Sequence, residues 1–229
     1  ISACLVGSEM CIRDRSNSMK WGYIMDEEAP YIDVRTVHID DATALYKLDY
    51  SFETDSIYTL RVQGPLAQGD TNSSASSKPA LAFELLETPV DPPLYKSLRE
   101  FGSSLAELEA KLSCVEGGYI ALAGGQVAGV ILLNVEEERS VAYIENIIVG
   151  RQFRRYGIGS LLLSCASDWA RNHACWAILL EIQSINYPAI QFYLRNGLEV
   201  WGINNHFYPP GSDEYQVAIF MGKKLWSVP

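Results

Sequence analysis

Apolar residues in the second half of the chain follow two different periods. Continuous or alternating apolar runs predict strands over residues 119–123, 127–135, 141–149 and 177–182. Apolar positions three and four residues apart predict an amphipathic helix over residues 158–171. A second helix is expected over residues 188–196, begun by Asn186 and ended by Gly197. The strand–helix–strand order from 141 to 182 predicts a right-handed parallel crossover.

The remaining elements have weaker signals. Asp40–Asp41 precedes a short apolar stripe and predicts a helix start. Residues 80–88 are expected to be extended, and prolines from Pro89 onward are expected to break this segment. Further strands are expected over residues 31–39, 57–62, 200–208 and 216–225, and a further helix over 105–112. Together these elements predict an α/β (α+β) domain with a mixed central sheet and helices on both faces.

Two segments fall outside this pattern. Residues 1–18 have no amphipathic period and no secretory signal, so we expect a non-native or disordered leader, with a native start at Met19 or Met25. Residues 64–79 are small and polar and are expected to form a flexible loop. The expected organisation is therefore a single domain over residues 19–229.

Composition narrows the class of protein. The chain has 229 residues, of which 48% are hydrophobic and 20% charged, which argues against disorder and fibrous structure. Eighteen basic and 28 acidic residues give a net charge of −10, which disfavours nucleic-acid binding and favours small cations. The apolar runs are far shorter than the ~20 residues that a membrane span needs. The five cysteines form no C-x-x-C pair, so we expect no zinc site and a reduced, cytoplasmic setting.

The richest chemical signal lies in residues 150–160, GRQFRRYGIGS, between a predicted strand and a predicted helix. Gly157 and Gly159 allow a ligand to approach the backbone, and the first amides of the helix lack intrahelical partners. With the helix dipole and nearby arginines, these amides suit a pyrophosphate. The segment is neither a Walker loop nor a dinucleotide fingerprint. By itself, the glycine pair fits tight packing as well as phosphate binding.

The stretch Arg154–Gly159, RRYGIG, matches the R/Q-x-x-G-x-G/A signature of the GNAT N-acetyltransferase superfamily. Residues 186–198, NYPAIQFYLRNGL, resemble its second motif, N-x-x-A-x-x-F-Y-x-x-x-G-F, with Leu198 in place of phenylalanine. Residues 179–186 and 143–149 resemble segments of streptothricin acetyltransferases. The resemblance covers about residues 118–225 and implies the GNAT fold, with a splayed pair of parallel strands.

The resemblance also implies the donor, acetyl-CoA, bound between the two splayed strands as a co-substrate without a metal. The pantetheine arm is expected on the backbone of Ile147, Ile148 and Val149. The pyrophosphate is expected on the segment made of Arg154, Arg155, Tyr156, Gly157, Ile158, Gly159 and Ser160. Asn186 is expected to contact the cofactor, to cap its helix, or to do both.

For catalysis, the resemblance makes Tyr193 the candidate general acid for the CoA thiolate, the alternative being a packed aromatic. Glu145 is the candidate base, because a carboxylate in an apolar strand should be buried with a raised pKa; a substrate anchor and a hydrogen-bonded buried residue are the alternatives. Glu181, in the neighbouring strand, is a second candidate for the base and is expected to contact the substrate. Phe207 and Tyr208 either line the acceptor pocket or fill the core.

The implied reaction is direct attack of a primary amine on acetyl-CoA, without an acetyl-enzyme. The leading acceptor is a cationic small molecule such as a streptothricin-type antibiotic, which acetylation would inactivate. The alternatives are a protein N-terminal or lysine acetyltransferase and a non-catalytic acyl-CoA-binding module. Nucleic-acid and membrane partners are not expected, and the two last strands leave a homodimer open.

Overall fold

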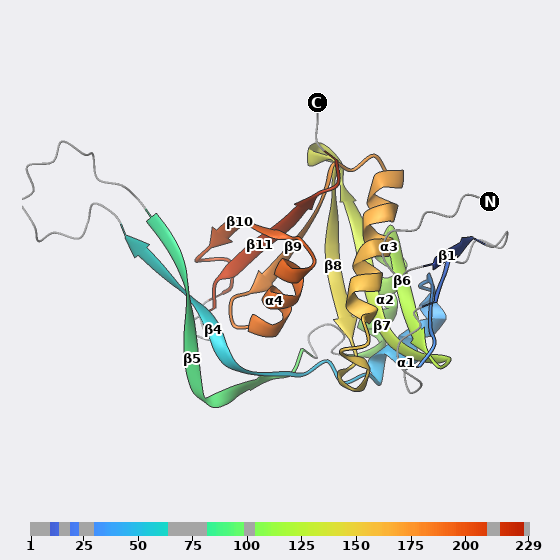
Figure 1. Ribbon diagram of the computed structural model, residues 1–229, viewed down its shortest axis with the longest axis horizontal. Helices are drawn as coiled ribbons and strands as arrows, with labels where there is room; N and C mark the ends of the chain where they lie inside the picture. Colours follow the sequence, from blue (N-terminus) through green and yellow to red (C-terminus); the bar gives the residue numbers. More distant parts are fainter. Residues whose placement is uncertain are drawn as a thin grey trace, which may run out of the picture. The chain divides into compact units, whose positions relative to one another are not determined.

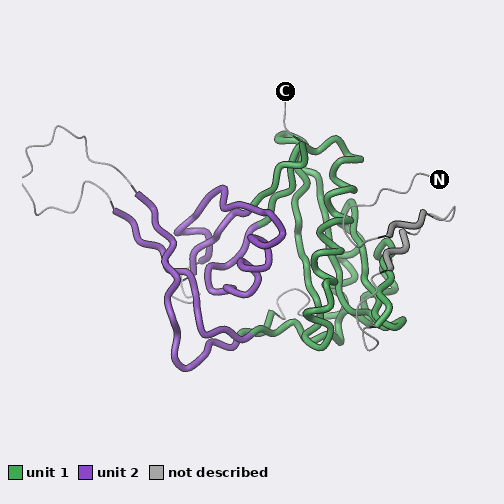
Figure 2. The backbone as a smooth tube through the Cα atoms, viewed as in Figure 1, with its two compact units in different colours: residues 1–52, 96–180, 222–229 green, residues 53–95, 181–221 purple. Residues whose placement is uncertain are grey.

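The computed structural model describes residues 10–13, 19–22, 30–63, 82–98, 104–209 and 216–226. The chain divides into two compact units, shown in different colours in Figure 2. Unit 1 contains residues 1–52, 96–180 and 222–229, and unit 2 contains residues 53–95 and 181–221. The expected loop over 64–79 and most of the expected leader over 1–18 lie outside the described residues.

Figure 1 shows the helices and strands of the described residues. From residue 32 onward they follow the order expected from the sequence, whereas the strands at residues 10–13, inside the expected leader, and at residues 19–22 were not expected. The strands are β1 (Met10–Arg13), β2 (Met19–Gly22), β3 (Ile32–Thr36), β4 (Phe52–Gln63), β5 (Ala82–Lys96), β6 (Gly117–Ala123), β7 (Gln126–Glu136), β8 (Val141–Val149), β9 (Ala177–Gln183), β10 (Glu199–Asn204) and β11 (Ala218–Lys224). The α-helices are α1 (Ala42–Tyr46), α2 (Leu105–Cys114), α3 (Ile158–Asn172) and α4 (Tyr187–Arg195). No α-helix in the described ranges is long and apolar enough to cross a membrane.

A seven-stranded mixed sheet has the order β10-β11-β9-β8-β7-β6-β3. Strands β3, β6, β7 and β8 pair antiparallel with their neighbours in this run, whereas β8 and β9 pair in parallel. The parallel register joins Val141–Tyr143 to residues 177–179, only the first three residues of each strand. The β8–α3–β9 unit is therefore the expected parallel crossover, and the α+β prediction is confirmed.

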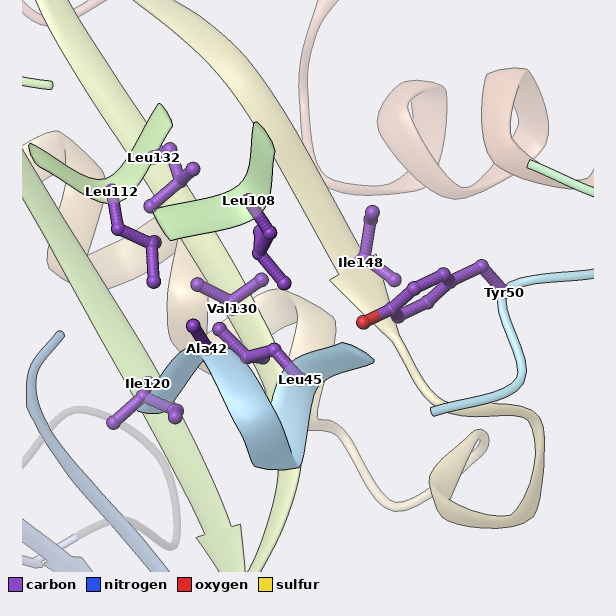
Figure 3. Close-up of a cluster of buried hydrophobic side chains, with 9 residues drawn as sticks. All are labelled: Ala42, Leu45, Tyr50, Leu108, Leu112, Ile120, Val130, Leu132 and Ile148. Atoms are coloured by element: carbon purple, nitrogen blue, oxygen red, sulfur yellow. The ribbon is translucent and has the colours of Figure 1, made fainter. Parts of the chain in front are cut away.

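In unit 1, helices cover both faces of the sheet. A Cβ placed on Gly117 would lie 2.5 Å from the Trp169 ring of α3, so this face of β6 packs directly under that helix. The next residue, Gly118, faces Val37 and Leu132 on the opposite side. On that side α1 and α2 bury one apolar cluster against the sheet (Figure 3), made of Ala42, Leu45, Tyr50, Leu108, Leu112, Ile120, Val130, Leu132 and Ile148.

Strands β4 and β5 correct two expectations. β4 begins five residues before the predicted 57, and β5 continues through Pro89, Pro92 and Pro93 to Lys96. The prediction that prolines end this segment is wrong. These two strands form a separate two-stranded sheet, so in the described residues no strand lies beside the outer edge of β5, and a proline that lacks an N–H is tolerated there.

In unit 2, β4 is tied to the segment that follows β9 and to α4. The Tyr58 amide donates to the Ser184 carbonyl (3.0 Å), and Gln191 Nε2 donates to the Tyr58 hydroxyl (2.9 Å). Ser184 in turn donates its amide to the Val217 carbonyl and accepts the Val217 amide on its hydroxyl. β10 and β11 are neighbours in one sheet, so these strands pair within the chain.

Candidate active site

The glycine-containing bend at the start of α3 is the first part of the candidate site. Gly157 is the N-cap residue, with φ of 77° and no side-chain cap. The Leu161 amide makes its helical bond to the Gly157 carbonyl (3.0 Å), so the amides of residues 158–160 precede the first such bond. A Cβ on Gly157 would meet no atom within 4 Å, so the backbone there is open to a ligand. The bend combines free amides, the positive end of a helix dipole and space, which together suit an anion.

Arg154 is the arginine that the fold orients at this bend. Its Nε donates to the Val149 carbonyl at the end of β8 (3.1 Å) and its side chain is half-buried, whereas Arg155 and Tyr156 are exposed. Burial lowers the pKa of Arg154, and the negative charge of Asp49 opposes that effect. A guanidinium remains charged at physiological pH in any case. Arg154 therefore presents a positive charge, oriented by its bond to Val149, in the segment that leads to the amides of residues 158–160.

Asp49 forms a hydrogen bond with the loop that joins β8 to α3. Its carbonyl accepts the Arg151 amide (3.0 Å), and its carboxylate accepts the Ser51 amide (2.9 Å). Hydrogen bonding from Ser51 lowers the pKa of Asp49, and the charges of Arg151 and Arg154 lower it further. No sequence motif pointed to Asp49, because the contact joins segments about 100 residues apart.

Strand β8 supplies the backbone expected to hold the pantetheine arm. Ile147, Ile148 and Val149 pair with β7 on one side, while the β8–β9 ladder stops at Tyr143 on the other. The backbone groups of these three residues that face β9 are therefore not part of the β8–β9 ladder. Gly129 of β7 pairs with Val149 and lets the backbones of β7 and β8 come close together. A Cβ on Gly129 would lie 2.6 Å from the Ile148 carbonyl oxygen. An isolated glycine in a strand is the sequence signal that indicates such an approach.

Glu145 is exposed, so the expectation of a buried carboxylate is wrong. The β7–β8 register joins Leu132 to Asn146 and Leu133 to Ile144, which leaves Glu145 as an extra residue without a partner. This bulge interrupts the alternation of the strand, and the side chain becomes exposed. Its carboxylate accepts a hydrogen bond from Asn134 Nδ2 (3.0 Å).

In unit 2 the structure brings together Tyr193 and Glu181. Tyr193 on α4 is 5% exposed, and burial raises the pKa of its phenol, which the charge of Glu181 raises further. Glu181 on β9 is partly buried, and burial raises the pKa of its carboxyl, although a hydrogen bond from Tyr208 opposes this. A partly buried carboxylate with a raised pKa is therefore found at Glu181 and not at the exposed Glu145.

The other predicted residues of unit 2 have defined places. The side chain of Asn186 accepts the Ala189 amide (3.4 Å) as the N-cap of α4, which confirms its capping role. Phe207 is 47% exposed and contacts Tyr208 and Phe220 with its ring. Tyr208 donates its hydroxyl to the Glu181 carboxylate, a contact between residues 27 positions apart that spacing alone did not predict.

The model of the acetyltransferase (GNAT) family matches residues 84–198, half of the chain. The chain therefore belongs to this family and is an N-acetyltransferase that uses acetyl-CoA.

Among its relatives, a streptothricin acetyltransferase of Streptomyces lavendulae is 29% identical over 82% of this chain and 92% of its own length. A crystal structure of nourseothricin acetyltransferase superposes with a TM-score of 0.66 at 27% identity, covering 85% of this chain and 98% of that one. A structure described as a putative streptothricin acetyltransferase from Bacillus anthracis, in complex with acetyl coenzyme A, gives a TM-score of 0.64 at 25% identity, covering 84% of this chain and 98% of that one.

Proposed function

We propose that this acetyltransferase acetylates a primary amine of a cationic small molecule, of the streptothricin type, and so inactivates it. The observation that carries this proposal is the partly buried Glu181 carboxylate beside Tyr193, a site suited to an ammonium group. The similarity to streptothricin acetyltransferases over most of the chain and the net charge of −10 support it. Acetylation would remove one positive charge from such a molecule.

The proposed donor site consists of the bend and the end of β8. The amides at the start of α3 and the Arg154 guanidinium would hold the pyrophosphate of acetyl-CoA, with Arg155, Tyr156, Gly159 and Ser160 in the same segment. Ile158 is 1% exposed, so its side chain would not contact the cofactor. The backbone of Ile147–Val149 would pair with the pantetheine amides, and Asn186 would contact the cofactor while it caps α4.

In the proposed reaction, the neutral amine attacks the acetyl carbonyl, a C–N bond forms, and the thioester C–S bond breaks. The amine proton passes to a carboxylate, directly or through water, and the CoA thiolate accepts a hydrogen bond or a proton from Tyr193. A Tyr193 phenol that gives up its proton regains one from the carboxyl group through water. Glu145 remains a candidate for the carboxylate, but the burial of Glu181 makes it the better base. A covalent acetyl-enzyme on Cys165 is disfavoured, because burial raises the pKa of that thiol to about 11.

A thiol-release assay tests this function. Protein and acetyl-CoA are mixed with streptothricin, other polyamines, aminoglycosides, or peptides with free N-termini and lysines, and the products are identified by mass spectrometry. We expect rapid thiol release with streptothricin and a mass gain of one acetyl group on an amine of the drug. Acetylation of peptides alone would indicate a protein acetyltransferase. CoA binding without turnover of any amine would indicate a non-catalytic binding module.

A further inference from the structure

Tyr208 and Glu181 form a hydrogen bond between two different parts of unit 2. Tyr208 lies just after β10, and its hydroxyl donates to Oε1 of Glu181 near the end of β9. The contact is partly buried, so water competes with it less than at the surface. The carboxylate is therefore held by a side chain that comes from a separate segment.

Aromatic contacts fix the ring of Tyr208. Phe207 lies edge-to-face against Tyr208, with ring centroids 5.3 Å apart, and edge-to-face against Phe220 of β11, at 5.6 Å. The turn before them is closed by the His206 amide, which donates to the Asn204 side chain (2.9 Å). The direction from which the Tyr208 hydroxyl reaches Glu181 is therefore set by β11 and by the turn.

We propose that Tyr208 is a positioning residue, which orients the Glu181 carboxylate and favours its ionised form for the acceptor amine. This inference rests on the proposed role of Glu181 as the group that receives the amine proton. A hydrogen bond to the ionised carboxylate favours that form, whereas burial disfavours it. Tyr208 thereby opposes the effect of burial on the ionisation of this carboxyl group without moving it into water.

Besides Tyr208, the titratable group whose charge state couples to Glu181 among the described residues is Tyr193 on α4. Its phenol stays protonated throughout the physiological range, because both burial and the Glu181 charge raise its pKa. Of Glu181 and Tyr193, the carboxyl group is therefore the one that loses its proton first as the pH rises.

The decisive measurement follows the Glu181 carboxyl carbon by NMR as a function of pH, without any substrate. Glu181→Gln identifies the resonance by its loss. In Tyr208→Phe we expect the titration midpoint to rise by about one pH unit, because a hydrogen bond to a charged group is removed. Tyr95→Phe, at an exposed tyrosine of β5, is the matched control and should leave the midpoint unchanged. An unchanged or lowered midpoint in Tyr208→Phe would overturn the proposal.

A second readout needs no substitution at Tyr208. In the otherwise unchanged protein with labelled tyrosine, the phenol carbon of Tyr208 should change shift at the midpoint of Glu181, and Glu181→Gln should abolish that change. If Tyr208→Phe does not fold, this measurement decides alone. The absence of any such coupling would also refute the hydrogen bond.

Turnover then separates positioning from a merely structural role. For Tyr208→Phe, we expect the acid limb of kcat/KM to move to higher pH by the same interval as the NMR midpoint, so that the loss is about 10-fold at low pH and small at high pH. An equal loss at every pH would contradict positioning. If the unsubstituted protein turns over no amine, the proposed function fails, while the substrate-free titrations still report on the Tyr208–Glu181 contact.

Discussion

Asn134 on β7 holds the carboxylate of Glu145 on β8, through a hydrogen bond of 3.0 Å from its side-chain amide. The Asn134 carbonyl oxygen accepts the Glu116 amide (3.0 Å), and the Glu116 carboxylate accepts the Val135 amide (2.7 Å). An exposed carboxylate at a bulge is thus fixed by a short chain of polar contacts. Its orientation is defined, although its environment is not the apolar one that would favour a general base.

The two candidate carboxylates can be ranked by parallel substitutions. We expect Glu181→Gln to lower kcat by about 100-fold, the lower end for a lost general base, and Glu145→Gln to lower it only several-fold. The reason is that Glu181 is partly buried and Glu145 is exposed. Steady-state kinetics at saturating acetyl-CoA measure the difference. Asn134→Ala, which frees Glu145 without removing it, serves as the control. A larger loss in Glu145→Gln would reverse the ranking.

Arg154 is expected to contribute to donor affinity. Arg154→Ala should weaken CoA binding by about 10-fold, because one charge-assisted contact to a phosphate is lost. Titration calorimetry with CoA measures this, and the loss should shrink as salt is raised. Arg171→Ala, at an exposed arginine paired with Asp168 at the end of α3, is the matched control. Equal affinities for the Arg154 and Arg171 variants would exclude Arg154 from the donor site.

Substitution of Gly157 is expected to lower stability through backbone strain and not through steric clashes of the new side chain. Its φ is 77°, and a Cβ would have space, so Gly157→Ala should cost about 1 kcal/mol of stability through backbone strain alone. CoA affinity should also fall, because the amides of the bend would shift. Gly157→Asn should lose less, since asparagine tolerates this region better. Urea unfolding and calorimetry report both quantities. A fully stable alanine variant would mean that the bend relaxes freely.

Tyr193 is expected to act on kcat and not on donor binding. Tyr193→Phe keeps the buried ring and should lower kcat by about 100-fold while leaving the Kd for CoA unchanged. Because burial and Glu181 raise the pKa of this phenol, it stays protonated as pH rises through the ordinary tyrosine range. The phenol should therefore give the unsubstituted enzyme no basic limb in its pH profile of kcat, and Tyr193→Phe should leave the basic side of that profile unchanged in shape. Unchanged kcat in Tyr193→Phe would return the residue to a packing role.

Asp41 is expected to make unit 1 sensitive to acid. Burial disfavours its charge, but the Arg35 guanidinium, which donates over 2.6 and 2.8 Å, and the His38 amide more than offset this and lower its pKa. The stability from ionised Asp41 is present above its unfolded pKa of about 3.9 and is lost as pH falls through the lower folded value. Asp41→Asn should cost about 1–2 kcal/mol at pH 7 and less at pH 2–3. Urea unfolding at both pH values checks this, and an equal cost at each would contradict it.

The sequence by itself determined the elements with strong periodicity and the local motifs. The apolar spacing of residues 158–171 predicted α3, and Asn186 predicted its capping role, because both depend on neighbours within a few positions. The two family motifs, at residues 154–159 and 186–198, likewise identified the class of enzyme. These signals are local, so no knowledge of distant contacts was required.

Tertiary structure decided what depends on distant neighbours. The bulge that exposes Glu145 arises from the register with β7, and the partly buried carboxylate of Glu181 accepts a hydrogen bond from a tyrosine 27 residues away. The outer edge of β5, beside which no strand lies in the described residues, allows β5 to continue through its prolines. In each case the environment of a residue is set by the strand or side chain packed beside it, and strand register and long-range pairing leave no periodic trace in the sequence.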